Sequence, residues 1–238
     1  MRHAAAHINL IGYQPSGSTT ASTVWSGGAT SYVQLTSGAA LEVVSASAND
    51  AAAGTGARTV KVEGLDASYV PFSETIILNG VTPVPLVNTS AVAINRTTVL
   101  TAGSGLVNAG KIDVRAVSGA AVKSSIQAVA ESSGVSADFV YTVPAARYGL
   151  LKRIQVYART NTGDIWAYLK TFNTGGVGLV QAVGQHSLDV TGFSSGEIVM
   201  NFGTGLYIPE KTLITLISDV SAGTPVVSAI AELEIYAS

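Results

Sequence analysis

Short runs in which apolar and polar residues alternate dominate this chain, and this pattern most constrains its fold. The runs are bounded by Gly, Asn, Ser, Thr and Pro, and helical periodicity is nearly absent. Successive side chains of a strand point to opposite faces, so such runs predict antiparallel sheets. We therefore expect an all-β protein. Strands are predicted over 32–35, 41–45, 59–62, 75–78, 111–117, 124–129, 139–143, 150–160, 165–171, 179–183, 198–202, 213–218 and 226–236.

The 238 residues are expected to form two β-rich domains and an extended N-terminal arm. Residues 1–41 are assigned to the arm, since no Asp, Glu, Lys or Arg lies between Arg2 and Glu42. Residues 42–132 form the first β domain. The small polar stretch AVAESSGVSA then marks a boundary. Residues 133–238 carry roughly seven or eight predicted strands, which suits an antiparallel sandwich or jelly roll.

Three local signals refine this picture. Asn79-Gly80 is the pair preferred in a type I′ hairpin turn. Pro83 and Pro85 cannot donate to a ladder, so the segment after that turn belongs at a sheet edge or in a loop. In LKRIQVY, the apolar residues share one face only if a bulge or twist intervenes near Lys152 and Arg153.

Composition favours a protein whose surface is covered by neighbours. Only 12% of the residues are charged, about half the usual share, while 47% are hydrophobic. The formal charge of -2 provides no basic excess for a nucleic acid backbone, so no nucleic acid partner is expected. No apolar run is long enough to span a bilayer and no secretion signal is visible, so we expect a soluble, unexported chain without a membrane partner.

The search for chemistry predicts no catalytic residue, no cofactor and no metal site. Cysteine is absent, and the HAAAH segment at the N-terminus has no recognisable third ligand for a metal. A glycosidase-like carboxylate pair is the enzymatic alternative, but the acids of the second half sit beside turn signals. These acids are Asp138, Asp164, Asp189 and Glu197.

Aromatic residues provide the other candidate site. Trp166, Tyr168 and Phe172 lie on one predicted strand, where core packing is the favoured interpretation. A sugar-binding platform formed by Trp166 and Tyr168 is the alternative.

Two groups of segments resemble virion proteins of tailed bacteriophages. The first covers residues 49–113 through NDAAAGTGARTV, GLD, SETIILNG, INR and AGS. The second half is similar, more loosely, to jelly-roll modules of phage decoration, head-fibre and tail-associated proteins, through YTVPAARYGLLKRI and GLYIPEKTLITL. These are patterns of turns and strands, not of catalytic residues.

The resemblance implies a non-enzymatic decoration or cement protein on the outer surface of a phage capsid. Its expected partners are the major capsid protein and further copies of itself, with a trimer favoured. The alternative is a tail, neck or short-fibre component that binds a host-surface glycan through Trp166 or Tyr168. The residues expected to contact the capsid or another subunit are Ile8, Leu10, Tyr13, Trp25, Tyr32, Arg58 and Lys61.

Overall fold

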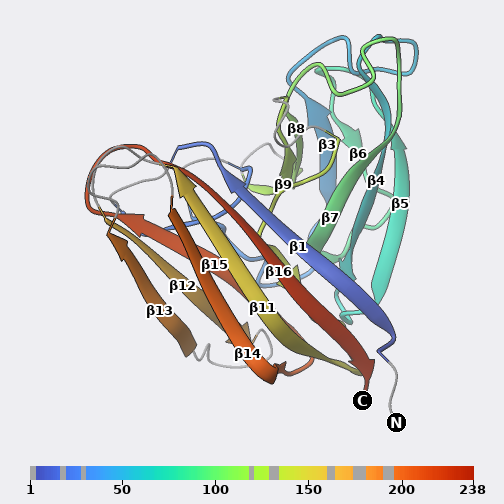
Figure 1. The fold of residues 1–238 in the computed structure, drawn as a ribbon. Helices are drawn as coiled ribbons and strands as arrows, with labels where there is room; N and C mark the ends of the chain where they lie inside the picture. The colour runs from blue at the N-terminus through green and yellow to red at the C-terminus, as the bar shows by residue number, and fades with distance from the viewer. Residues whose placement is uncertain are drawn as a thin grey trace. The chain divides into compact units, whose positions relative to one another are not determined.

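The protein is all-β, as the alternating pattern predicted (Figure 1). The computed structural model describes residues 4–16, 20–27, 31–117, 121–128, 134–159, 164–173, 181–189 and 196–238. These residues form strands, turns and irregular segments, and none of them belongs to a helix that could cross a membrane.

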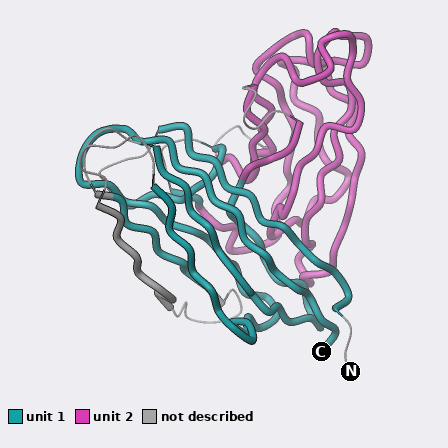
Figure 2. The backbone as a smooth tube through the Cα atoms, viewed as in Figure 1, with its two compact units in different colours: residues 1–32, 138–238 teal, residues 33–137 magenta. Residues whose placement is uncertain are grey.

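The chain folds into two compact units (Figure 2). Unit 1 consists of Met1–Tyr32 together with Asp138–Ser238, and unit 2 is the intervening segment Val33–Ala137. The second predicted boundary, between residues 132 and 133, lies outside the described residues. Because unit 1 includes both ends of the sequence, the N-terminal residues belong to the same unit as the C-terminal residues.

Unit 1 contains two antiparallel sheets. Sheet A has the order β1-β16-β11-β14 and sheet B the order β10-β15-β12-β13, with β2 also pairing with β15. The strands of sheet A are β1 (Ala6–Gln14), β16 (Val226–Ala237), β11 (Arg147–Arg159) and β14 (Gly196–Ile208). Those of sheet B are β10 (Val140–Thr142), β15 (Thr212–Val220), β12 (Asp164–Asn173), β13 (Gln181–Asp189) and β2 (Ser22–Thr23).

The strand pairing identifies unit 1 as a jelly roll. Its eight main strands are β1 and β10 to β16. Taken in chain order, the first pairs with the eighth (β1 with β16), the second with the seventh (β10 with β15), the third with the sixth (β11 with β14) and the fourth with the fifth (β12 with β13). These nested pairs alternate between the two sheets, which is the arrangement of two Greek keys. The prediction of a sandwich or jelly roll is confirmed. Unit 2 is inserted between β2 and β10, which both lie along the same edge of β15.

The prediction of an extended N-terminal arm is wrong for Ala6–Gln14, because this segment is β1, paired along its whole length with β16. Alternate residues of β1 are buried, and Leu10 belongs to the core of unit 1. The carboxamide of the fully buried Gln14 donates to Ser22 Oγ and accepts from Ser218 Oγ, each at 2.7 Å. Because an unpaired buried amide is costly, these bonds fix the end of β1 against sheet B.

The core of unit 1 lies between its sheets, as the alternating strands require. In β11, Leu151, Ile154 and Val156 all point into this core. Three residues with this spacing share a face because the register shifts between Leu151 and Arg153, which confirms the predicted irregularity.

Unit 2 has its own pair of sheets and its own core. The sheets have the orders β6-β3-β8-β9 and β5-β4-β7, and one buried cluster is shared between them. Pro85 lies in the edge strand β6, as predicted. The strands are β3 (Leu41–Ser45), β4 (Ala57–Asp66), β5 (Pro71–Ile77), β6 (Val84–Pro85), β7 (Ala91–Ala102), β8 (Ile112–Ala116) and β9 (Val122–Ile126).

A buried carboxylate organises the loops of unit 2. Asp50 is fully buried and accepts four hydrogen bonds. One comes from Ser45 Oγ at 2.6 Å, and the others come from the backbone N–H groups of Ala57, Ala109 and Gly110 at 2.7–2.9 Å. These hydrogen bonds replace the water that the Asp50 carboxylate loses on burial. They also join the turn before β4 to the loop before β8. A side chain at Gly56 would place its Cβ 2.1 Å from the Asp50 carboxylate, so glycine is required there.

The turn at Asn79-Gly80 differs from the predicted type I′ hairpin. Only Gly80 has a positive φ, of 62°, whereas type I′ requires it at both central residues. Gly80 N donates to the Asp50 carbonyl at 2.7 Å, and the next strand, β6, pairs with β3 rather than with β5. The Asp50 loop therefore determines the path of this turn.

Replacing Asp50 with Asn should destabilise the protein by about 3 kcal/mol, because the amide removes the charge and directs N–H groups at backbone donors. Chemical denaturation followed by circular dichroism measures the change. Asp66→Asn is the matched control: Asp66 accepts from two backbone N–H groups in an exposed turn, so its loss should be about 1 kcal/mol or less. Equal losses for both variants would contradict the central role of Asp50.

Candidate functional site

The solvent-facing side of sheet A, called the outer face below, carries the most organised set of exposed side chains in unit 1. Strand register places these side chains in rows that cross all four strands. Four features follow along the outer face: an apolar row, a charged network, a shallow hollow and a group of tyrosines.

The apolar row contains Ile11 of β1, Ile230 of β16, Gln155 of β11 and Val199 of β14, which are direct cross-strand partners. Ile11, Ile230 and Val199 are 37%, 44% and 36% exposed. Isoleucine and valine suit strands, and here they lie partly exposed in one row, in which Gln155 separates Ile230 from Val199.

Polar and aromatic residues border the apolar row. Tyr157, 40% exposed, lies one row further along β11, where its cross-strand partner on β14 is Glu197. Gln155 Nε2 donates to Glu197 Oε1 at 2.9 Å and to Tyr157 Oη at 3.2 Å. The outer face therefore combines apolar side chains, tyrosine and a polar margin.

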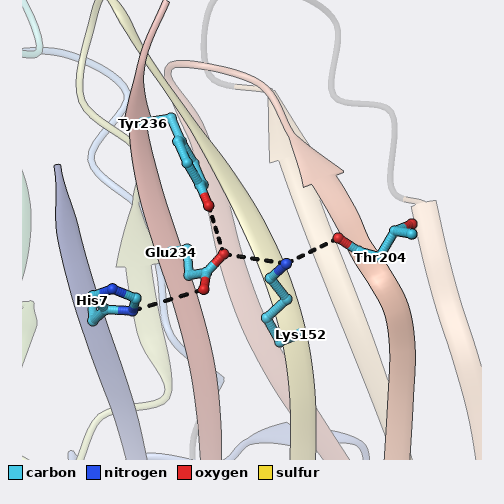
Figure 3. A network of polar contacts seen from close by, with 5 residues as sticks. All are labelled: His7, Lys152, Thr204, Glu234 and Tyr236. Atoms are coloured by element: carbon cyan, nitrogen blue, oxygen red, sulfur yellow. Dashed lines mark hydrogen bonds and ion pairs between the residues drawn. The ribbon is translucent and has the colours of Figure 1, made fainter. Parts of the chain in front are cut away.

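A charged network centred on Glu234 lies further along the outer face (Figure 3). Tyr236 Oη donates to Glu234 Oε2 at 2.8 Å, and Lys152 Nζ lies 3.2 Å from the same oxygen. His7 Nδ1 is 3.9 Å from the other oxygen, Oε1. Lys152 also donates to the Thr204 carbonyl at 3.0 Å. Figure 3 shows that these side chains come from β1, β16, β11 and β14.

The bulge of β11 positions Lys152. Between the pairs Leu151↔Leu206 and Arg153↔Asn201, β11 contains one residue and β14 contains four. Gly203 and Gly205 of β14 adopt positive φ angles of 54° and 111°, which allow this excursion. The Thr204 carbonyl is thereby placed where Lys152 can reach it.

The network shifts the pKa values of its members. The hydrogen bond from Tyr236 lowers the pKa of Glu234, burial opposes this effect, and Lys152 and His7 lower the pKa further. The same hydrogen bond, followed by burial, raises the pKa of Tyr236. Glu234 is therefore held as a carboxylate.

Three tyrosines, one of them Tyr236 of the network, form a cluster. Tyr148 stacks on Tyr236, with ring centroids 5.3 Å apart and an interplanar angle of 11°. Tyr207, 59% exposed, contacts the Tyr148 ring at a centroid distance of 5.4 Å. The rings come from β14, β11 and β16, and they form an aromatic patch at the end of the outer face nearest Glu234.

A shallow hollow of about 160 Å³ lies on sheet A around the Glu234 network. Its lining comes from three strands and carries two carboxylates, an ammonium, an imidazole and a carboxamide. The lining residues are His7, Ile8, Asn9, Lys152, Glu232, Leu233 and Glu234.

Two residues predicted to contact the capsid or another subunit are instead in the interior of unit 1. Leu10 is 4% exposed and belongs to the core, and Trp25 is 2% exposed. The Trp25 ring packs edge-to-face on Tyr32 at a centroid distance of 5.4 Å. The prediction is wrong for Leu10 and Trp25, because their apolar surface is already buried in their own unit.

The other predicted contact residues are distributed over both units. Ile8 packs against the core of unit 1, and Tyr13 is half-buried on the outer face. Tyr32 is half-buried, and burial followed by the nearby Asp138 carboxylate raises its pKa. In unit 2, Arg58 Nε donates to the Gly54 carbonyl at 3.0 Å and Lys61 pairs with Glu63 at 3.0 Å.

Trp166 and Tyr168 share the side of β12 that faces away from the core of unit 1. Both are half-buried, while the intervening Ala167 is fully buried. The pair therefore remains a candidate for ligand contact.

The four carboxylates considered for catalysis have different surroundings. Asp138 is buried and accepts from Ser26 N at 3.1 Å, and Glu197 is exposed and accepts from Gln155. The side chains of Asp164 and Asp189 lie outside the described part of the chain. Among the described residues, no group of three or more His, Asp or Glu side chains is arranged to hold a metal ion.

Sequence reasoning missed the Glu234 network. The alternation in AELEIYA indicates that Glu232, Glu234 and Tyr236 share a face of one strand. Their partners His7 and Lys152 are remote in sequence, so only strand pairing could reveal the network.

No protein-family model matches the chain, and no curated protein matches it. Among solved structures, a structure of the infectious bursal disease virus Gx strain has 9% identity and a TM-score of 0.26 over 100% of this chain and 77% of that one. T=1 particles of mutant VP2 from the same virus have 12% identity and a TM-score of 0.21, over 99% and 70% of the two chains. Its VP2 subviral particle has 11% identity and a TM-score of 0.18, over 98% and 72%. Likenesses at this level carry no argument about function.

Replacing Tyr236 with Phe should raise the pKa of Glu234, because the variant loses the hydrogen bond that contributes most to its lowering. A carboxylate whose pKa is lowered by folding stabilises the protein above its unfolded-state pKa, and this contribution is lost as pH falls through the folded-state pKa. Tyr236→Phe should reduce this contribution of Glu234 to stability. A carbon-detected NMR titration of the glutamate side chains measures the change, with Tyr207→Phe as the control. An unchanged Glu234 titration in Tyr236→Phe would contradict the assignment.

Proposed function

We propose that this chain is a non-enzymatic virion structural protein that binds and stabilises the outer surface of a phage capsid, as a decoration or cement protein. Its expected partners are the major capsid protein and further copies of the chain, with a trimer favoured. The proposal is supported by a sequence resemblance and by the fold of unit 1. Residues 49–113 resemble segments of tailed-phage virion proteins, and unit 1 has the strand order of a jelly roll, an architecture that viral capsid proteins use repeatedly.

The observation that carries the proposal is the apolar row of Ile11, Ile230 and Val199 on the outer face. Ile11 and Ile230 are adjacent, Gln155 separates them from Val199, and Tyr13 and Tyr157 flank the row. This arrangement suits the centre of an interface from which water is excluded. Burial of each remaining exposed isoleucine surface would contribute about 1 to 2 kcal/mol.

The low charge of the chain supports binding by burial rather than by electrostatic attraction. With 12% charged residues and a net charge of -2, long-range steering toward a charged partner is weak. A homo-oligomer would present several outer faces to a repeating shell at once. Several weak contacts then give strong overall binding, because each contact after the first forms at a high effective concentration.

The second candidate function is a tail, neck or short-fibre component that binds a host-surface glycan. The position of Trp166 and Tyr168 on the outward side of β12 favours this alternative. Aromatic faces bind the C–H faces of sugars, whereas an interface with a shell would depend on the apolar row.

The double variant Ile11→Lys with Ile230→Lys should weaken binding to the shell by roughly 100-fold, since it removes about 3 kcal/mol of apolar burial and adds two charges to the contact. Co-sedimentation with shells of the encoding virus, purified without this protein, measures the affinity. Circular dichroism verifies folding, and light scattering at several concentrations measures the oligomeric state.

Val87→Lys is the matched control, because Val87 is 87% exposed and lies in unit 2. It should retain wild-type binding. A folded double variant that also binds like the wild type would contradict the role of the apolar row. Deletion of residues 1–41 does not provide this test, because it removes β1 from sheet A.

A further inference from the structure

We infer that the hollow around Glu234 is a binding site for a neutral saccharide, recognised through a pair of adjacent hydroxyl groups. This inference goes beyond the proposed capsid binding and does not depend on it. It also assigns the sugar to sheet A, and not to Trp166 and Tyr168 on sheet B.

The first argument is that Glu234 is a fixed carboxylate with one oxygen available. Oε2 accepts from Tyr236 and contacts Lys152. Oε1 lies 3.9 Å from His7 Nδ1, beyond hydrogen-bond distance, and accepts no hydrogen bond from the described residues. The surrounding strands thus hold an acceptor in place before any ligand arrives, which reduces the entropy that binding costs.

A second acceptor and a donor lie on the same hollow. Glu232 is exposed, and its carboxylate has no hydrogen-bond or ion-pair partner among the residues that the structure describes. Lys152 has three N–H donors, of which contacts to Glu234 and to Thr204 account for two. Two carboxylates that accept and one ammonium that donates match the hydroxyl groups of a sugar, each of which both donates and accepts.

The charges of the lining decide between ligand classes. Glu232 and Glu234 are balanced by Lys152 in the lining and by Arg153, the cross-strand partner of Glu232, so the site has no positive excess to favour an anion such as phosphate when His7 is neutral. A metal ion is disfavoured as well, because the described residues contain no cluster of three metal-ligating side chains. A neutral polyhydroxylated ligand fits these constraints.

The size and the margin of the hollow agree with a sugar. A volume of about 160 Å³ suits one sugar ring rather than a drug-sized molecule. The rings of Tyr148, Tyr207 and Tyr236 lie beside it, where they can contact the apolar face of a neighbouring sugar unit. A shallow, open site of this kind binds single sugars weakly.

The test is saturation-transfer NMR of the full chain with D-glucose, D-galactose, D-mannose and N-acetyl-D-glucosamine, each at millimolar concentration. We expect transfer to at least one of them, at least tenfold weaker binding in Glu232→Ala and in Glu234→Gln, and no loss when sodium chloride is raised. Glu197→Ala, an exposed carboxylate variant on the same sheet, should bind like the wild type.

Three results would overturn the inference. They are no transfer to any of the four sugars, transfer that both Glu232→Ala and Glu234→Gln leave unchanged, and transfer that is abolished by Trp166→Ala but retained in the two glutamate variants. Backbone amide spectra of each variant establish that it is folded, so a loss of binding reports on the hollow and not on the stability of sheet A.

Discussion

Unit 1 depends on the pairing of its first strand with its last. β1 and β16 lie at opposite ends of the sequence, and their ladder completes the nested pairing of the jelly roll. Bringing such distant segments together costs chain entropy, which the buried face of sheet A and the Gln14 hydrogen bonds offset. Because β1 supplies His7, Asn9 and Ile11, both the hollow and the apolar row require this pairing.

Unit 2 depends on a different interaction. The Asp50 carboxylate replaces its lost hydration with one hydroxyl and three backbone donors, drawn from segments on either side of it in the sequence. The segments that supply these donors contain small residues, among them Gly56, Ala57, Ala109 and Gly110. Such residues allow loop backbones to approach a buried carboxylate closely, and Gly56 is the clearest case.

The outer face combines two kinds of surface. The row of Ile11, Ile230 and Val199 offers apolar area, which favours a large protein partner. The hollow around Glu234 offers fixed acceptors and a donor, which favour a small polar ligand. The bulge in β11 separates them, since it places Lys152 beside Glu234 while Ile154 and Val156 remain in the core. The two proposed functions would therefore use different parts of one sheet.

The sequence by itself determined the all-β class, the restriction of Pro85 to a sheet edge or a loop, and the irregularity at Lys152, because each follows from the alternation or chemistry of a local segment. It did not determine that residues 6–14 form a strand of unit 1, that Leu10 and Trp25 are buried, or that Glu234 meets Lys152 and His7. Alternation shows which side chains of a strand share a face. Only the tertiary structure decides which strand lies beside it, in which register, and which of its two faces is covered, because these depend on contacts between segments remote in sequence.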